Sequence, residues 1–154
     1  ETPLIETARA VNTSMPGHTV DQLDKKLAAN GVDLAAASVL VLGLTYRPGV
    51  EELRYAPALD VIDLLLNADV DVSAHDPLLA PETIAEFGAM PVTDPTAVNG
   101  IDGIVLATGH KEYADLDVTA LREAVDTPVF VDGRDFFDAE KLSAFDYTVI
   151  GKPE

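Results

Sequence analysis

The sequence predicts an α/β fold in which a parallel sheet is covered by helices on both faces. From residue 38 onward, short apolar runs of strand length alternate with helical segments. The runs "SVLVLGLTY", "GIVLATG" and "PVFVDGR" are almost continuously apolar, which is typical of strands buried on both sides. Because strand–helix–strand crossovers are right-handed, we expect a doubly wound, Rossmann-like sheet of about five to six strands.

The first 37 residues precede this alternation. We expect residues 1–37 to form a helical connector or appendage and residues 38–154 to form the α/β domain. Helical spacing covers residues 3–13 and about 17–30, and Pro16 is expected to separate these two helices.

Each later element is expected from its local pattern. The helix over 57–68 places four apolar side chains on one face and has Pro57 at a favourable first position. The stretch 69–76 alternates with period two, as a strand does. The expected strands are 38–46, 69–76, 90–94, 103–109, 128–134 and 147–151. The other expected helices are 81–88, 117–125 and 139–145, with a helical turn at 95–100.

Composition excludes several classes of function. With 27 acidic and 10 basic residues the formal net charge is −17, so nucleic acid and anionic membranes are not expected partners. The chain has no cysteine, and therefore no disulfide, thiolate metal site or cysteine nucleophile of its own. No long apolar run or signal-peptide pattern is present, so we expect a cytoplasmic protein. The acidic surface favours a halophilic source.

Candidate ligand-binding residues follow the predicted strands, because ligands of doubly wound sheets bind beyond the carboxyl ends of the strands. Those ends carry Tyr46 and Arg47, Asp76, Asp94, residues 108–110, and Arg134. The loop after the first strand is neither a G-x-G-x-x-G dinucleotide loop nor a P-loop.

Arginine in this loop suggests an anionic ligand. The guanidinium groups of Arg47 and Arg54 suit phosphate oxygens, either of one diphosphate or of two ligands on either side. The alternative is an ion pair with Glu51 or Glu52.

Other polar residues are less specific. Arg134 can bind an anion or pair with Asp132 or Asp135, and Asp76 can simply cap the turn before Pro77. His75 and His110 are too isolated in the sequence to predict a metal site. No carboxylate pair has the spacing of an acid–base couple, so we expect no catalytic residue.

Three ordered motifs carry a family resemblance. "GLTYRPGVEELRYAPALDVIDLLL", "VSAHDP" and "VFVDGR" together resemble the C-terminal, UDP-sugar-binding domain of the UDP-glucose/GDP-mannose dehydrogenase family. The opening "TARAVNTSMP" is most similar to the UDP-N-acetylmannosamine and related N-acetylhexosamine 6-dehydrogenases. The loop departs from the family pattern, with Arg47 for lysine, Glu52 for aspartate and Tyr55-Ala56 for an acidic–serine pair.

The resemblance implies a fragment of an enzyme that oxidises a sugar C6 alcohol to a carboxylate in two NAD-dependent steps, through a cysteine thiohemiacetal. Tyr46, Arg47 and Arg134 would bind the UDP-sugar and Arg54 the NAD, which an N-terminal dehydrogenase domain would hold. The full-length enzyme would be a homo-oligomer. Because the chain lacks the catalytic cysteine, we expect it to be inactive alone. UDP-glucose as the substrate, or a free-standing nucleotide-binding module, are the alternatives.

Overall fold

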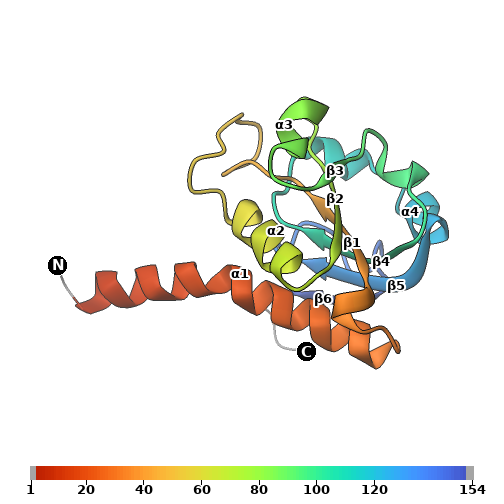
Figure 1. Ribbon diagram of the computed structural model, residues 1–154, viewed down its shortest axis with the longest axis horizontal. Helices are drawn as coiled ribbons and strands as arrows, with labels where there is room; N and C mark the ends of the chain where they lie inside the picture. Colours follow the sequence, from red (N-terminus) through yellow and green to blue (C-terminus); the bar gives the residue numbers. More distant parts are fainter. Residues whose placement is uncertain (1–2, 152–154) are drawn as a thin grey trace.

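The computed structural model describes residues 3–151, apart from the side chains of residues 8, 9, 11 and 12. Its centre is a six-stranded sheet in which all neighbouring strands are parallel, in the order β3-β2-β1-β4-β5-β6 (Figure 1). The strands are β1 Ser38–Leu42, β2 Asp71–His75, β3 Met90–Pro91, β4 Ile101–Leu106, β5 Val125–Asp132 and β6 Asp146–Val149. This is the strand order of a doubly wound, Rossmann-type sheet, so the predicted fold class is confirmed.

Helices cover both faces of the sheet. The α-helices are α1 Pro3–Ala29, α2 Pro57–Asn67, α3 Pro81–Ala85 and α4 Val118–Ala124. The 3₁₀ helices are η1 Leu34–Ala36, η2 Pro95–Ala97 and η3 Lys111–Asp115. Alternate residues of β1 point into two separate cores: Val39 and Val41 into the core with α1 and α2, Leu40 and Leu42 into the core with η3 and α4. Within the described residues, no helix is both long and apolar enough to cross a membrane.

The N-terminal region differs from the prediction in one respect. Residues 3–13 and 17–30 do not form two helices, because α1 continues through Pro16 as one helix (Figure 1). A proline removes one backbone hydrogen bond of a helix, a cost that tertiary packing can offset. Pro16 is buried, and the following turns bury Leu23 and Leu27 completely against the sheet. The C-terminal half of α1 is therefore a layer of the α/β core.

The segment 139–145 also differs from the prediction, since it forms consecutive turns rather than a helix. Its amides bond to carbonyls three or four residues earlier, for example Phe145 to Leu142 at 2.9 Å. Turns suffice to bury Leu142 and Phe145 in the second core.

Candidate functional site

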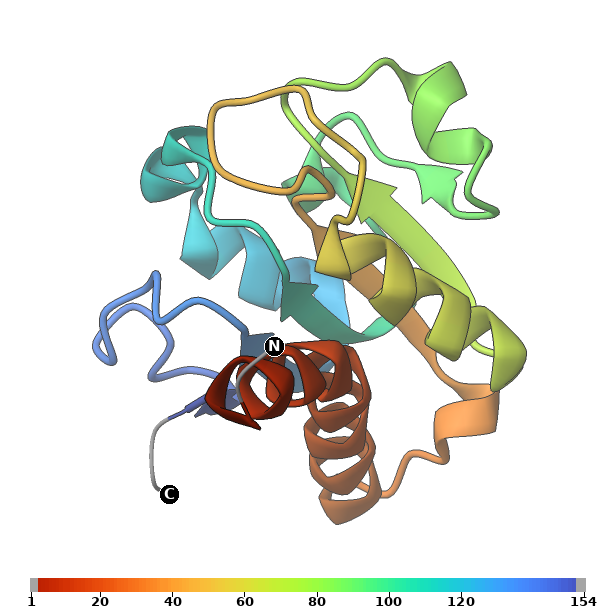
Figure 2. The same ribbon diagram turned by 90° about the vertical axis from the view of Figure 1, so that its left-hand side faces the viewer.

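The carboxyl ends of β1, β4 and β5 approach one another so closely that two glycines are required. A Cβ atom on Gly43 would lie 2.2 Å from the carbonyl oxygen of Thr108, and the φ of Gly43 is +83°. A Cβ atom on Gly133 would lie 2.7 Å from the carbonyl oxygen of Leu106. Gly43 ends β1, which is therefore shorter than the predicted strand over 38–46. The chain from 43 to 56 is a loop that stands out beyond the sheet (Figure 2).

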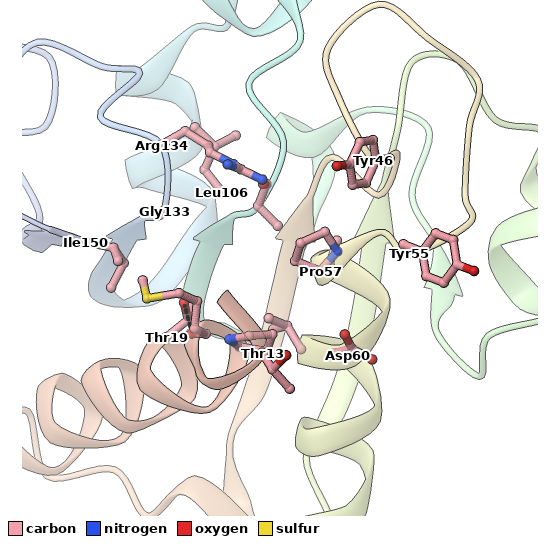
Figure 3. Close-up of a pocket in the computed structure, with 15 residues that line it drawn as sticks. Thr13, Thr19, Tyr46, Tyr55, Pro57, Asp60, Leu106, Gly133, Arg134 and Ile150 are labelled. Atoms are coloured by element: carbon pink, nitrogen blue, oxygen red, sulfur yellow. Dashed lines mark hydrogen bonds between the residues drawn. The ribbon is translucent and has the colours of Figure 1, made fainter. Parts of the chain in front are cut away.

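A pocket of about 610 Å³ lies beside these strand ends (Figure 3). Its walls come from α1, the loop after β1, the first turn of α2, and the ends of β4, β5 and β6. The lining residues are Thr13, Met15, Pro16, Thr19, Tyr46, Tyr55, Pro57, Ala58, Asp60, Val61, Leu106, Ala107, Gly133, Arg134 and Ile150. This volume is within the range of small-molecule sites. The α1 and α2 walls had no signal in the sequence, because only the tertiary fold brings these helices to the strand ends.

Arg134 places a positively charged side chain on the wall of this pocket. Its Nε–H donates to the carbonyl oxygen of Ala107 at 2.9 Å, which directs the guanidinium across the end of β4 (Figure 3). The carboxylate of Asp132, one of the predicted alternatives for pairing with Arg134, instead accepts three backbone N–H groups. They belong to Arg134, Phe136 and Phe137, at 2.9 to 3.0 Å. Asp132 thus shapes the loop that presents Arg134.

Tyr46 is the other predicted site residue that lines the pocket. This residue is about half exposed, at 49%. Its backbone N–H donates to the carbonyl oxygen of Glu52 at 2.6 Å, which closes the loop on itself. Tyr55 follows at the rim with 84% exposure and an unfavourable φ of 61°. Bulky residues rarely adopt such a φ, and strain of this kind gathers at ligand sites.

Arg47 and Arg54 lie on the same loop but do not line this pocket. Both side chains are exposed. The carboxylate of Glu52 accepts the backbone N–H of Arg54 at 3.0 Å rather than its guanidinium. Among the described residues, no carboxylate forms an ion pair with Arg47, Arg54 or Arg134.

A buried polar cluster joins the ends of β1, β2 and β4, and no motif of the sequence predicts it. His110 follows β4 and Asp76 follows β2, and both side chains are fully buried. Nε2 of His110 lies 2.9 Å from Oδ2 of Asp76 and 3.1 Å from Oγ1 of Thr45, and Nδ1 accepts the backbone N–H of Gly49 at 3.1 Å. The strand order brings these residues together, since β2 and β4 both flank β1.

Asp76 is more than the turn cap that we weighed for it. Oδ1 of Asp76 accepts the backbone N–H of Leu78 at 2.8 Å, as a cap does. Oδ2 also accepts the N–H of Leu44 at 2.7 Å, in the first residues after β1. The carboxylate therefore ties the end of β2 to the start of the 43–56 loop.

His75 and Tyr113 extend the cluster. Nδ1 of His75 lies 2.9 Å from the hydroxyl of Tyr113, which also donates to the His75 carbonyl oxygen at 3.0 Å. Burial lowers the pKa of His75 below its usual 6.5, against the opposing effect of Asp76 and Asp94. Burial likewise raises the pKa of Tyr113. At neutral pH both side chains are therefore uncharged.

The pocket has the chemistry of a binding site. Among the described lining residues, the charged side chains are Arg134 and Asp60, and none is a histidine or lysine. The first turn of α2, with the partial positive charge of a helix N-terminus, forms one wall. Within the described residues, no group of three or more histidine, aspartate or glutamate side chains is arranged to hold a metal ion.

Comparison with known proteins agrees with this description. Residues 40–139 match the model of the UDP-glucose/GDP-mannose dehydrogenase family, UDP binding domain. A UDP-glucose 6-dehydrogenase of Bacillus subtilis is 32% identical over 155 residues, which cover 97% of this chain and 33% of that protein. A UDP-N-acetyl-D-glucosamine 6-dehydrogenase of Pseudomonas aeruginosa is 29% identical over 78% of the chain and 28% of its own length.

Solved structures give the same relationship. The UDP-D-ManNAc dehydrogenase of Pyrococcus horikoshii matches with a TM-score of 0.85 and 26% identity, over 98% of this chain and 34% of that one. The UDP-glucose dehydrogenase of Pyrobaculum islandicum matches with a TM-score of 0.72 and 29% identity, over 88% of this chain and 30% of that one. This chain thus spans about a third of the length of its relatives. The chain belongs to the UDP-glucose/GDP-mannose dehydrogenase family, and residues 40–139 are its UDP binding domain.

Proposed function

We propose that this chain is the UDP-sugar-binding portion of an NAD-dependent nucleotide-sugar 6-dehydrogenase and is inactive alone. The observation that carries the proposal is the pocket of the UDP binding domain, where Arg134 and Tyr46 converge from β5 and from the loop after β1. A cationic fork suits a diphosphate, and an aromatic ring suits a planar or sugar group.

Arg134 fits the diphosphate role in a specific way. Its bond to Ala107 uses Nε–H and leaves the two terminal NH₂ groups for a ligand, with no ion-pair partner among the described carboxylates. Asp60, also on the pocket wall, is an acceptor for ribose or sugar hydroxyls.

The proposed roles of Arg47 and Arg54 do not rest on this pocket, because both residues lie outside it. Arg47 is assigned to the UDP-sugar and Arg54 to NAD, on the resemblance of the loop to the family. Their exposure, and the lack of carboxylate partners among the described residues, leave both guanidinium groups available to a ligand. We infer that NAD is bound chiefly by an N-terminal dehydrogenase domain, with Arg54 contributing one contact.

An N-acetylhexosamine is the sugar that we propose, with UDP-N-acetylmannosamine as the first candidate. The resemblance of the opening residues supports it, together with two structures that match well: the UDP-D-ManNAc dehydrogenase at a TM-score of 0.85 and an NDP-N-acetyl-D-galactosaminuronic acid dehydrogenase of Methanosarcina mazei at 0.84. A UDP-N-acetyl-mannosamine dehydrogenase of S. aureus scores 0.72. The UDP-glucose dehydrogenase of Pyrobaculum islandicum scores 0.72. UDP-glucose is the second candidate, on the 32% identity with the Bacillus subtilis enzyme.

The proposed partners are the dehydrogenase domain and a second copy of the full-length enzyme. The first turns of α1 extend away from the α/β core (Figure 1), and Leu4 is 79% exposed. An apolar side chain in such a position suits burial against another part of the assembly.

Titration calorimetry tests the binding function directly. The 154-residue chain is titrated with UDP, GDP and inorganic pyrophosphate, and we expect UDP to bind most tightly. Equal binding of all three would show that the pocket recognises only a diphosphate. Absence of UDP binding would contradict the assignment.

A second experiment tests the reaction and the sugar. The chain with NAD is assayed for NADH formation on UDP-N-acetylmannosamine, UDP-N-acetylglucosamine and UDP-glucose, and we expect none. The same panel is then assayed with the chain joined to a cysteine-bearing dehydrogenase domain of the family, where the N-acetylated sugars should be preferred. Turnover by the isolated chain would overturn the partial-enzyme proposal.

A further inference from the structure

We propose that His110 is a positioning residue of the UDP-sugar site. Its buried imidazole holds the 43–56 loop in its binding form by accepting a hydrogen bond from Gly49. The loop in turn carries Tyr46 on the pocket wall. The inference deepens the proposed UDP-sugar function and rests on it.

The hydrogen bonds of His110 require one protonation state. A backbone N–H can only donate, so Nδ1 of His110, at 3.1 Å from the nitrogen of Gly49, must be an acceptor without a proton. The proton of the neutral ring is then on Nε2. It is shared by Oδ2 of Asp76 at 2.9 Å and Oγ1 of Thr45 at 3.1 Å. The imidazole therefore links Asp76, at the end of β2, to Gly49 in the loop after β1.

Further bonds tie the same part of the loop to the strand ends. The hydroxyl of Thr45 donates to the carbonyl oxygen of Arg47 at 2.9 Å, so it is free to accept from Nε2 of His110. The hydroxyl of Thr108 donates to the carbonyl oxygen of Thr45 at 2.6 Å. Residues 45, 47 and 49 are thus each anchored by a side-chain bond within one buried network.

The loop depends on such anchors at its exposed tip. It has no helix or strand between Leu42 and Pro57, and residues 46–52 are exposed. Gly49 adopts a φ of +74°, which the bond to His110 holds in place. Loss of that bond would let the exposed turn and the attached ring of Tyr46 move.

The cluster is not a hydrolytic triad, although it contains a carboxylate, an imidazole and a hydroxyl. In a triad the carboxylate and the hydroxyl bind opposite ring nitrogens. Here Asp76 and Thr45 share Nε2, and Gly49 takes the other nitrogen. Both Thr45 and His110 are fully buried, so a substrate cannot reach the hydroxyl.

Two substitutions test the two ring nitrogens of His110 separately. His110→Gln places an amide NH₂ where Nε2 was and keeps the donor to Asp76, but it loses the acceptor for Gly49. His110→Asn places an amide oxygen where Nδ1 was and keeps the acceptor for Gly49, but it leaves buried Asp76 without that donor. His18→Gln and His18→Asn, on exposed His18 of α1, are the matched controls.

If His110 positions the loop, the variant that loses more Tm should not be the variant that loses more UDP affinity. For His110→Gln we expect the smaller loss of Tm but a UDP Kd weaker by about three- to tenfold, as for one lost hydrogen bond. The Gly49 amide should also exchange faster. For His110→Asn we expect the larger loss of Tm, a UDP Kd within about twofold of wild type, and a protected Gly49 amide.

A purely structural role predicts that UDP affinity follows Tm in both variants, and that result would overturn the inference. So would a Gly49 amide that stays protected in His110→Gln. In the unmutated chain, ¹⁵N NMR must show an unprotonated Nδ1 on His110, and a proton there would equally overturn it. If wild type does not bind UDP, the proposed function fails, while the Gly49 exchange and the tautomer still decide the positioning role.

Discussion

Arg134 and Ala107 are joined by a 2.9 Å hydrogen bond from the Nε–H of the arginine to the carbonyl oxygen of the alanine. The bond spans the ends of β5 and β4 and directs the guanidinium into the pocket. The cationic group of the site is therefore held in position before any ligand arrives. Such preorganisation lowers the entropy that is lost on binding.

The first prediction concerns this arginine. Arg134→Ala should weaken UDP binding by about ten- to a hundredfold, because charge-assisted bonds to phosphate are worth roughly 1.5–3 kcal/mol. Arg134→Lys should recover part of the affinity, since it keeps the charge but not the fork. Titration calorimetry with UDP measures both.

Arg122→Ala is the matched control. Arg122 also donates its Nε–H to a carbonyl oxygen, that of Ala144 at 3.1 Å, but it does not line the pocket. We expect its UDP affinity to stay within about twofold of wild type. Equal losses of affinity in Arg122→Ala and Arg134→Ala would assign Arg134 to the fold rather than to the site.

The second prediction concerns Gly133. A Cβ atom there would press on the Leu106 carbonyl oxygen, a backbone atom with little freedom to move. Gly133→Ala should reduce the free energy of unfolding by about 1–3 kcal/mol and should also lower UDP affinity, because it displaces Arg134. Urea denaturation and calorimetry give the two values.

Gly17→Ala tests whether the effect is specific to the strand ends. Gly17 lies inside α1, and apart from its chain neighbours and the helix's own backbone no described atom lies within 4 Å of its added Cβ. The change should raise the free energy of unfolding by up to about 1 kcal/mol, since alanine favours a helix over glycine. Unchanged stability and affinity in Gly133→Ala would refute the close approach of β4 and β5.

The third prediction concerns pH and His75. Burial lowers the pKa of His75 in the folded state below its usual 6.5. Between the folded-state pKa and 6.5, the unfolded chain binds more protons, so stability must fall as the pH falls through this window. His75→Asn does not titrate and keeps a polar atom near the Tyr113 hydroxyl, so its pH dependence should be flatter.

Urea unfolding at several pH values between 5 and 8 measures this slope, and His18→Asn controls for the loss of one histidine at an exposed position. A wild-type stability that rises on acidification through the window would contradict the sign of the effect. If the free energy of unfolding depends on pH identically in wild type and His75→Asn, the pH dependence belongs to another titratable group.

The fourth prediction concerns salt. The excess carboxylates that give the net charge of −17 repel one another, and 0.1 M salt screens this repulsion over about 10 Å. We expect the Tm to rise between low and molar KCl, as a halophilic origin would require. Scanning calorimetry measures it, and a neutral osmolyte at equal osmolality separates screening from solvent exclusion. A flat or falling Tm would count against the halophilic hypothesis.

Local patterns sufficed for most of the fold. The apolar runs that became β1, β4 and β5 were long enough to predict buried parallel strands, and the helix over 57–68 was placed within one residue. Local patterns failed at Pro16, because packing against the sheet decides whether a helix accommodates a proline. They also failed over 139–145, where turns are enough to bury Leu142 and Phe145 in the core. Tyr46 and Arg134 were found in the sequence because the ends of parallel strands share one edge of the sheet.

By itself the sequence determined the fold class, the family and two pocket residues, since hydrophobic periodicity and ordered motifs are written along the chain. Only the tertiary structure decided that α1 and α2 wall the pocket and that Arg47 and Arg54 lie outside it. It also decided that His110 meets Asp76, 34 residues away. The strand order brings these residues together, and it depends on packing between segments that are far apart in the sequence.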